Sequence, residues 1–170
     1  MRDIKIREAT VSDIEEVAKL HVDSWNETYA GIISPKYLEN MKNNLDKRIE
    51  RMKNEFGLRQ MIVAVLNNEI IGFSEFVLSN EFSKDLEIDC ELCGLYIKNG
   101  YKNLGLGSEI FEYVTTVFKE NSKKKMGLWC VKENIPAISF YQKKDGIFTK
   151  EKIFTIENQE YREVAFTYDL

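Results

Sequence analysis

Histidine and cysteine are scarce in this sequence, with one and three residues respectively among 170. An odd cysteine count without a framework spacing argues against a disulfide scaffold and indicates reduced thiols in a cytoplasmic protein. Cys90 and Cys93 form a C-x-x-C pair, but a metal site needs two further ligands, and only Cys130 and His21 could supply them. We therefore expect no metal, and we place Cys90 and Cys93 on opposite faces of one strand because their spacing is odd.

Long apolar runs and an excess of basic residues are also missing. No segment approaches the roughly 18 apolar residues that a membrane-spanning helix needs, and the first residues alternate charged and apolar types instead of forming a signal-peptide core. The 24 basic and 28 acidic side chains leave a net charge of −4, which argues against a nucleic-acid surface and permits a cationic substrate. We expect neither membranes nor nucleic acids as partners, while self-association into a homodimer stays open.

Proline- or serine-rich linkers and internal repeats are absent, so residues 1–170 are predicted to form one domain. Hydrophobic residues make up 44% and charged residues 31%, the balance of a globular protein with a sizeable core. Apolar periodicity and turn residues predict the element order β-α-α-β-β-β-α-β-α-β-β. Strands are expected at 3–7, 61–66, 70–78, 89–97, 126–131, 147–156 and 161–168, and helices at 12–25, 34–54, 106–120 and 136–144.

Local signals place the ends of several elements. Ser12 and Glu15 have the spacing of a capping box at the start of the first helix, and Asn67-Asn68 and residues 157–160 indicate hairpin turns. A strand, a glycine-rich loop, a helix and a further strand in succession are typical of a parallel crossover, and the hairpins on either side make the sheet mixed. The prediction is an α/β (α+β) fold around a mixed, mostly antiparallel sheet of about seven strands with about four helices.

The segment from Leu95 to Gly107 is the most informative part of the sequence, because a strand ends there, a loop with two close glycines follows, and an amphipathic helix begins. Such a loop presents unpaired backbone N–H groups at the positive end of a helix dipole, and Gly105 and Gly107 carry no Cβ that would keep a diphosphate away. The alternative is a tight turn that needs glycine only for its geometry. A P-loop is excluded because no Lys-Ser/Thr follows Gly107, and a dinucleotide fingerprint because no third glycine lies near Ile110.

Two motifs in this chain occur in the order and context of one known family. Lys102-Asn-Leu-Gly-Leu-Gly107 resembles the GNAT acyltransferase motif (Gln/Arg)-x-x-Gly-x-(Gly/Ala), with lysine in the first position. The segment from Asn134 to Lys144 resembles the second GNAT signature, an Asn followed by an Ala and a Phe-Tyr pair ahead of a Lys, although its Lys-Lys-Asp-Gly ending is one residue longer than in many members. The opening, the fourth strand and the last strand are also similar to GNAT proteins, so the likeness covers nearly the whole chain.

The resemblance implies acetyl-CoA as the acyl donor and assigns residues to it. Backbone N–H groups of the loop would hold the CoA diphosphate, and the backbone of Leu95 and Ile97 would pair with pantetheine where the sheet splays open. Asn134 would offer its amide to the cofactor, with a cap for the following helix as the structural alternative. The implied cofactor-binding residues are Leu95, Tyr96, Ile97, Lys102, Asn103, Leu104, Gly105, Leu106, Gly107, Ser108, Asn134 and Tyr141.

The resemblance also implies the catalytic groups. Tyr141 matches the tyrosine that protonates the departing CoA thiolate in many GNAT enzymes, and its alternative role is core packing, for which the neighbouring Phe140 is the more natural residue. Glu91 matches the general-base glutamate of histone-type members and could act directly or through water if burial raises its pKa. An ordinary strand glutamate is the alternative to that role, and Glu75 on the preceding strand is the substitute base.

The acceptor pocket is expected on the first helix and the connection after it, where GNAT proteins usually build it. Trp25 and Tyr29, with His21, could form an aromatic wall whose acidic neighbours help to hold a cationic amine by cation–π contact. Packing of the first helix into the core is the alternative explanation for the same residues. Trp25, Tyr29 and Glu75 are the predicted acceptor-binding residues.

Together these inferences predict an N-acetyltransferase that transfers the acetyl group of acetyl-CoA to a primary amine by direct attack. The acceptor is a small molecule, polyamine-like or amino-acid-like, or a protein amine. Two other classes stay open: a catalytically silent acyl-CoA-binding sensor or interaction module of the same fold, and a structural protein whose glycines serve only a turn. The presence of Glu91 and Tyr141 favours the enzyme.

Overall fold

A computed structural model describes residues 4–170, and the chain divides into two units. The first unit contains the chain up to Phe76 together with Gly94–Val114, and the second contains Val77–Cys93 and Thr115–Leu170. Residues 1–3, which include the start of the first predicted strand, lie outside the described part of the chain.

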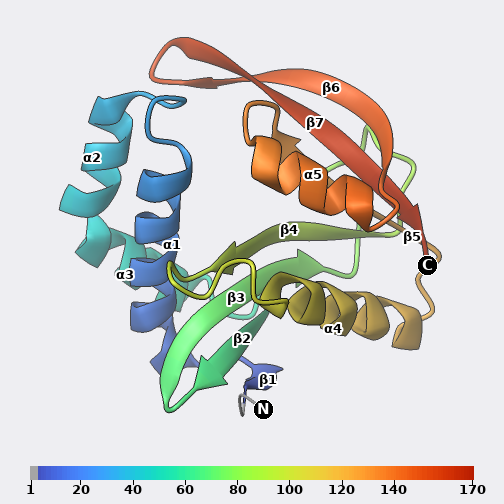
Figure 1. Cartoon of the computed structure of the whole chain (residues 1–170), viewed down its shortest axis with the longest axis horizontal. Helices are drawn as coiled ribbons and strands as arrows, with labels where there is room; N and C mark the ends of the chain where they lie inside the picture. Colours follow the sequence, from blue (N-terminus) through green and yellow to red (C-terminus); the bar gives the residue numbers. More distant parts are fainter. Residues whose placement is uncertain (1–3) are drawn as a thin grey trace. The chain divides into compact units, whose positions relative to one another are not determined.

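The elements follow the predicted order along the chain (Figure 1). They are β1 (Lys5–Glu8), a short 3-10 turn (Val11–Asp13), α1 (Ile14–Thr28), α2 (Pro35–Asn43), α3 (Leu45–Asn54), β2 (Gln60–Leu66), β3 (Glu69–Val77), β4 (Cys90–Ile97), α4 (Leu106–Glu120), β5 (Lys125–Val131), α5 (Ile135–Lys143), β6 (Ile147–Ile156) and β7 (Gln159–Asp169). Over residues 4–170 the sheet order is β1-β2-β3-β4-β5-β7-β6, with β4 and β5 parallel and the β1–β2, β2–β3, β5–β7 and β6–β7 pairs antiparallel. The predicted mixed, mostly antiparallel seven-stranded sheet is confirmed.

The core of the first unit joins α1 to the β2–β3 hairpin. The hairpin turns at Asn67 and Asn68, which have the positive φ values (51° and 64°) predicted for this pair. Buried side chains from α1, β2 and β3 then meet in one cluster: Val17, Leu20, Val63, Ile70 and Phe73. Full burial of each such side chain contributes about 1.5–3 kcal/mol, so this cluster positions α1 and the residues on its later turns.

The predicted helix 34–54 is two helices in the structure, and this corrects the expected number of helices from about four to five within residues 4–170. Asn44 ends α2 and precedes α3 with non-helical dihedral angles (φ −112°, ψ 26°). Its side-chain amide donates to the carbonyl of Asn40 at 2.9 Å. Asparagine competes in this way with the backbone for hydrogen bonds, which favours helix ends over helix interiors.

The predicted capping box of Ser12 and Glu15 is also corrected, because the structure uses another pair, Thr10 and Asp13, two residues earlier. The N–H of Thr10 donates to Asp13 at 2.7 Å. Asp13 is held in place by two hydrogen bonds from Arg7 (2.7 and 2.9 Å), which with Thr10 lower its pKa to about 2. Glu15 instead lies on the exposed face of α1.

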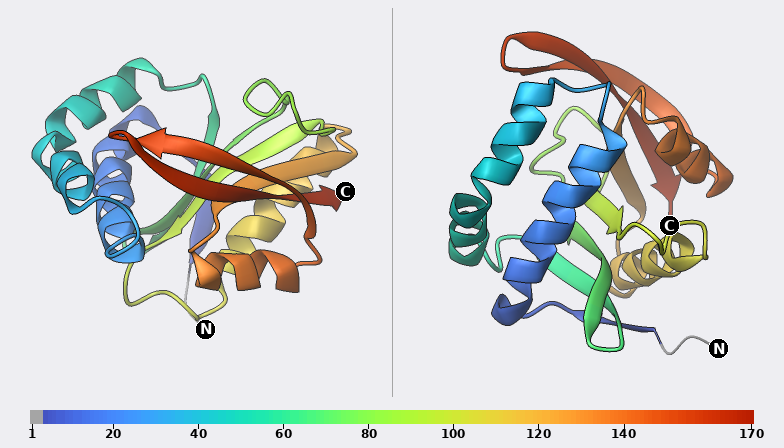
Figure 2. Two further views of the ribbon diagram at one scale, coloured as in Figure 1. Left: turned by 90° about the horizontal axis from the view of Figure 1, so that it is seen from above. Right: turned by 60° about the vertical axis from the view of Figure 1, so that its left-hand side comes forward.

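The second unit is built on β5, β7 and β6. Residues 90–92 of β4 pair in parallel with residues 126–128 of β5, and α4 connects the two strands along the chain, which confirms the predicted crossover. The β6–β7 hairpin is the long curved ribbon beside α5 in Figures 1 and 2. It turns at Glu157 and Asn158, both at positive φ (48° and 65°), so the turn is tighter than the predicted residues 157–160.

The cysteines are free thiols, and Cys90 and Cys93 both lie in β4 as expected. Burial raises the pKa of Cys90 and of Cys130 to about 12, so neither is a thiolate near neutral pH. Over residues 4–170, no cluster of three or more histidine, cysteine, aspartate or glutamate side chains has the arrangement of a metal site. In the same range, no helix is long and apolar enough to cross a lipid bilayer.

Candidate active site

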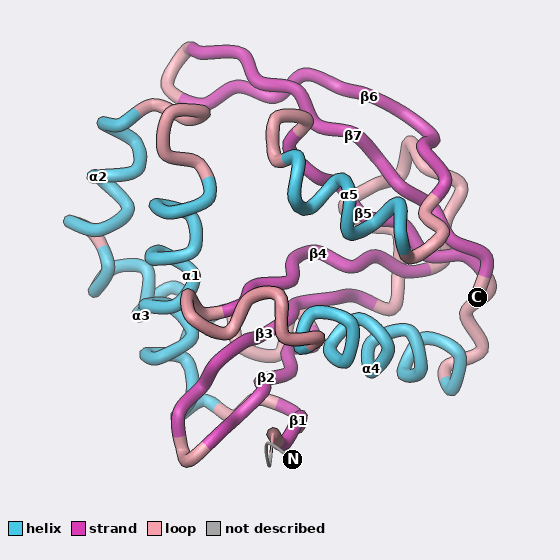
Figure 3. The backbone as a smooth tube through the Cα atoms, viewed as in Figure 1, coloured by secondary structure: helices cyan, strands magenta, loops and turns pink. Residues whose placement is uncertain are grey.

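The loop between β4 and α4 lies within the first unit and connects Ile97 to Leu106 (Figure 3). Its residues Gly100, Asn103 and Gly105 have positive φ values of 85°, 62° and 87°. Glycine adopts this conformation at little cost, and asparagine tolerates it better than most residues. Asn103 and Gly105 of the predicted motif, with Gly100 before it, therefore allow a backbone path that most other residues would resist.

Side chains attach this loop to the rest of the first unit. Lys98 forms an ion pair with Glu69, and the hydroxyl of Tyr101 donates to the same carboxylate at 3.3 Å. The Lys102 ammonium, at the family's Gln/Arg position, lies 3.2 Å from the carboxylate of Glu27 in α1. Exposed ion pairs of this kind add little stability individually, but together these contacts connect the loop to β3 and α1.

The start of α4 has the features of an anion site. N–H groups in the first turn of a helix have no carbonyl partner within the helix, and the helix dipole places partial positive charge there. The N–H of Ser108 donates to the carbonyl of Gly105 (2.9 Å), while Leu106 is 1% exposed and fixes the first turn in the core. A Cβ built on Gly105 would have no heavy atom within 4 Å, so the space beside it is open to a ligand. The loop therefore fits a diphosphate, although the N–H of Ser108 is already engaged.

The last residues of β4, the predicted cofactor residues Leu95, Tyr96 and Ile97, are half-buried. The Tyr96 ring stacks on Phe73, with ring centroids 4.8 Å apart and an interplanar angle of 20°. Gly94 makes room for that ring, since a Cβ at residue 94 would lie 2.6 Å from it. The side chain of Tyr96 thus packs against β3. Any predicted contact of Tyr96 with the cofactor would therefore be made by its backbone.

An aromatic cluster surrounds Trp25 in the first unit. Its rings belong to His21, Trp25, Tyr29, Tyr37, Phe73 and Tyr96. Trp25 and Tyr29, both predicted acceptor residues, have ring centroids 4.7 Å apart, and the Trp25 indole N–H donates to the Tyr96 hydroxyl at 3.4 Å. Both residues are half-buried, so they pack against neighbouring rings and keep part of their surface exposed.

His21 is an uncharged member of this cluster. Its ring lies edge-on to Tyr96 with a centroid distance of 4.7 Å. Its buried Nδ1 atom has no hydrogen-bond partner within residues 4–170. Burial, followed by the charges of Arg48 and Arg51, lowers the pKa of His21 to about 3. A histidine that is neutral over the physiological range serves here as a packing residue of the cluster, and it cannot supply positive charge.

Glu75 on β3 lies among arginine residues that the sequence analysis did not single out. One of its oxygens is 3.7 Å from Arg59, and burial raises its pKa while Arg59 and Arg48 oppose that shift. Arg48 comes from α3, whose sequence is rich in charge and offers no motif. Arg48 is recognised as a half-buried residue from the alternation of buried and exposed positions along α3, and this alternation is known only from the structure.

Glu91 is one of the predicted site residues that lie in the second unit, together with Asn134 and Tyr141. It is 6% exposed and sits on β4 opposite Gly127 of β5. Its role in proton transfer stays a prediction.

Tyr141 is the buried aromatic residue of α5. It is 8% exposed and its ring centroid lies 6.2 Å from that of Phe166, whereas Phe140 is half-buried. The expectation that Phe140 suits the core better is therefore wrong, because α5 turns Tyr141 toward β7. The hydroxyl of Tyr168 donates to the carbonyl of Tyr141 at 3.0 Å, which ties this turn of the helix to β7.

The two ends of α5 explain the rest of the second signature. Asn134 caps the helix, since its side-chain oxygen accepts from a first-turn N–H at 3.3 Å, and this confirms the structural alternative for that residue. The helix ends at Lys143, Asp145 takes a positive φ of 65°, and Gly146 follows. A Cβ on Gly146 would be 2.5 Å from the Tyr168 hydroxyl. The additional residue of this chain is thus accommodated after the helix.

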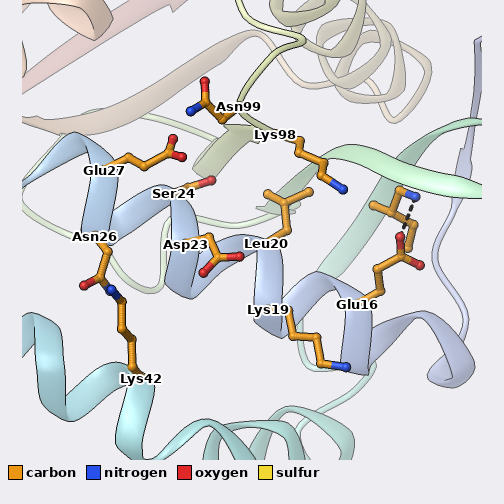
Figure 4. Close-up of a pocket in the computed structure, with 11 residues that line it drawn as sticks. Glu16, Lys19, Leu20, Asp23, Ser24, Asn26, Glu27, Lys42, Lys98 and Asn99 are labelled. Carbon is orange, nitrogen blue, oxygen red and sulfur yellow. Dashed lines mark hydrogen bonds between the residues drawn. The ribbon is translucent and has the colours of Figure 1, made fainter.

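A hollow of about 560 Å³ lies beside the loop in the first unit (Figure 4). Its walls are side chains of α1 together with Lys42 of α2, Ile70 of β3, and Lys98 and Asn99 of the loop. Charged groups of both signs face it, and none of the predicted site residues lines it. The candidate site is therefore the loop and the aromatic cluster, which carry predicted cofactor-binding and acceptor-binding residues.

Several known proteins are similar to this chain. The family model described as the Acetyltransferase (GNAT) family matches residues 14–147. The uncharacterized N-acetyltransferase YuaI of Bacillus subtilis is 28% identical over 95% of this chain and 91% of that protein. The spermidine N(1)-acetyltransferase of Thermoplasma acidophilum is 27% identical over 82% of this chain and 86% of that protein. The crystal structure of the PaiA N-acetyltransferase of T. acidophilum in complex with coenzyme A has a TM-score of 0.71 over 99% of each chain, at 21% identity.

The matched range includes the loop before α4 and the signature on α5, and it covers most of the chain. This chain belongs to the GNAT acetyltransferase family. It is an acetyl-CoA-dependent N-acetyltransferase, and the resemblance inferred from the two motifs is confirmed.

Proposed function

We propose that this enzyme acetylates a primary amine of a small molecule, polyamine-like or amino-acid-like, or of a protein, by direct attack of the amine. The proposal treats residues 1–170 as one catalytic domain. The observation that carries it is the loop before α4, where Gly105 at positive φ and the open space beside it fit the diphosphate of the donor. Acetyl-CoA supplies an activated acetyl thioester when bound.

The chain's own residues would hold the donor mainly through backbone atoms. N–H groups of residues 102–108 other than that of Ser108, which donates to Gly105, would bind the diphosphate, with the first turn of α4 contributing its dipole. The backbone of Leu95, Tyr96 and Ile97 would pair with the pantetheine arm. Asn134 would cap α5 through its oxygen and offer its NH₂ group to the cofactor.

Proton transfer would fall to two kinds of side chain. Glu91, or Glu75 as its substitute, would accept the proton that the amine must lose, so that the nitrogen lone pair can form the new C–N bond. Tyr141 would donate its phenolic proton to the sulfur as the C–S bond breaks. The raised pKa of the partly buried Glu75 supports proton uptake closer to neutral pH than an exposed glutamate would allow.

The acceptor would lie against Trp25, Tyr29 and Glu75. Aromatic faces attract cationic amines, and Glu75 adds a carboxylate beside them. The T. acidophilum relative named for spermidine supports an amine acceptor of low molecular weight. We further propose that the enzyme is located in the cytoplasm and has no nucleic-acid partner. A homodimer is compatible with this proposal.

The test is acetyl-CoA consumption by the purified protein against a panel of polyamines, amino acids, aminoglycosides and peptides, with CoA binding measured by calorimetry. CoA binding should also raise the melting temperature, because a ligand selective for the folded state stabilises it. Gly107→Trp should abolish binding and leave the far-UV circular dichroism spectrum unchanged. Lack of CoA binding by the wild type would contradict the proposal, and tight CoA binding without any turnover would favour the catalytically silent sensor.

A further inference from the structure

The inner face of α3 carries one charged residue, Arg48. Positions 45, 48, 49 and 52 of this helix are half-buried and the positions between them are exposed, which is the spacing of a helix with one side against a core. Leu45, Ile49 and Met52 are apolar, and Met52 packs against the core cluster of the first unit. Arg48 lies one helical turn before Met52 and shares its face. A guanidinium in this position is unfavourable unless something compensates for its lost hydration.

Arg48 lies near Glu75, one of the residues predicted to bind the acceptor, and near two tyrosines of the aromatic cluster. Its charge interacts with the hydroxyl groups of Tyr37 and Tyr96 in the aromatic cluster and with the carboxylate of Glu75. Burial first, and Arg51 second, lower the pKa of Arg48. The guanidinium therefore lies half-buried at the edge of the aromatic cluster, which is where an acceptor would be held.

No side chain in residues 4–170 forms a hydrogen bond or an ion pair with the Arg48 guanidinium. Glu75, the carboxylate that acts on it, is paired with Arg59 at 3.7 Å. Arg51 adds a further positive charge on the same helix. The planar donor fork of an arginine matches the two oxygens of a carboxylate and forms paired hydrogen bonds with it. The site thus provides an unused carboxylate-binding group and an excess of positive charge.

We propose that Arg48 binds a carboxylate of the acceptor, so that the amine acetylated by this enzyme belongs to an amino acid. This inference rests on the proposed function, because it names the substrate class of the same site. The aromatic cluster would contact the side chain of the amino acid while Arg48 fixes its carboxylate. A polyamine carries only positive charges, and Arg48 and Arg51 would repel it.

The test compares acceptors that differ only in the carboxylate. The probes are L-phenylalanine with L-phenylalaninamide and L-methionine with L-methioninamide, together with spermidine and cadaverine. Rates are expressed per unprotonated amine, because an amide lowers the pKa of the neighbouring amino group. We expect kcat/KM to be about 10- to 100-fold higher for each acid than for its amide, mainly through KM, which is the effect of losing charge-assisted hydrogen bonds.

Variants of α3 connect this preference to Arg48. Arg48→Gln should bring the acid-to-amide ratio of kcat/KM close to one. Arg48→Lys should restore part of the ratio, because an ammonium supplies the charge without the planar fork. Lys47→Gln removes the same charge from the exposed face of the same helix and should leave the ratio unchanged. CoA affinity within about twofold of wild type shows that each variant is folded.

Equal rates for the acids and their amides, or a preference for spermidine or cadaverine, would overturn this inference and leave the proposed function standing. Binding gives an independent readout through calorimetry with N-acetyl-L-phenylalanine and N-acetyl-L-phenylalaninamide, with and without CoA. Selective binding of the carboxylate that disappears in Arg48→Gln supports the inference, and equal binding or no binding of the two probes overturns it. Failure of the proposed function is recognised separately, by the absence of CoA binding in the wild type.

Discussion

The loop before α4 and the aromatic cluster belong to the same unit, but they are built from different parts of the chain. The proposed role of the loop depends on its backbone, with Gly105 at positive φ and the N–H groups of the first turn of α4. The cluster acts through side chains contributed by α1, α2, β3 and β4, with Arg48 of α3 at its edge. A required backbone conformation restricts the residue types at fixed spacing and so leaves a motif. A wall of side chains can be built from many combinations of residues and leaves none.

The largest expected effect concerns a single hydroxyl group, that of Tyr141. Tyr141→Phe keeps the ring that packs near Phe166 and removes the proposed proton donor. General acid catalysis contributes typically about 10²–10⁴-fold, so kcat should fall on that scale while CoA affinity stays close to wild type. Steady-state kinetics with the best acceptor, combined with calorimetry, measures both. An unchanged kcat would reduce Tyr141 to a packing residue.

A smaller effect separates backbone strain from binding at Gly105. Gly105→Ala and Gly57→Ala place the same methyl group on residues with similar φ (87° and 93°) and with no atom within 4 Å of the new Cβ. Both should lose about 1–2 kcal/mol of stability, because alanine is strained in this conformation. Only Gly105→Ala should also weaken CoA binding, by about 10- to 100-fold. Equal CoA affinities in the two variants would mean that Gly105 serves only the turn.

The identity of the base can be resolved by pH dependence. Glu91→Gln keeps the size of the side chain but cannot accept a proton, so kcat/KM should fall most at low pH, where the free amine is scarce, and partly recover at high pH. We expect a loss of about tenfold at the acidic end of the profile. A uniform small loss at every pH would indicate a structural glutamate instead.

Glu75→Gln provides the matched comparison for Glu91→Gln. If Glu75 is the true base, this variant should show the low-pH defect and Glu91→Gln should not. Because burial raises the pKa of Glu75, the fall of kcat/KM on the acidic side of the pH profile should begin at a higher pH than it would for an ordinary glutamate.

A full loss of CoA binding in Glu91→Gln would mean that Glu91 supports the strand that carries Leu95 and Ile97.

The last effect concerns stability and not activity. The folded-state pKa of His21 is about 3 against an ordinary value of 6.5, so the unfolded chain binds the proton first as the pH falls. The contribution of His21 to stability is therefore complete above about pH 6.5 and decreases toward pH 3, by about 1.4 kcal/mol per pH unit.

His21→Gln should flatten this dependence, which urea unfolding at pH 7, 6 and 5 would measure. Asp13 does not interfere, because its lowered pKa affects stability only below its ordinary value of 3.8. Glu75 acts in the opposite direction, since its raised pKa lets the folded state bind a proton first. An identical pH dependence in wild type and His21→Gln would contradict the buried, neutral assignment of His21.

Much of the fold could be predicted because its signals are local. The hairpin at Asn67-Asn68 and the crossover from β4 through α4 to β5 follow from turn residues and from apolar periodicity over short stretches. The predictions failed where two local interactions compete. Asn44 bonds to Asn40 and separates α2 from α3, and Asp13, held by Arg7, takes over the capping role expected of Glu15. Such competitions depend on side chains whose distances are unknown until the chain folds.

The sequence by itself determined the family, the order of strands and helices and the position of the glycine-rich loop before α4, because glycine spacing and apolar patterns constrain the backbone directly. Only the tertiary structure decided which side chains pack together. In the tertiary structure Tyr141 is buried in place of Phe140, the ring of Tyr96 stacks on Phe73, and Arg48 lies near the aromatic cluster. The physical reason is that contacts between residues distant in sequence depend on how helices pack onto a sheet. No pattern within a single segment encodes that packing.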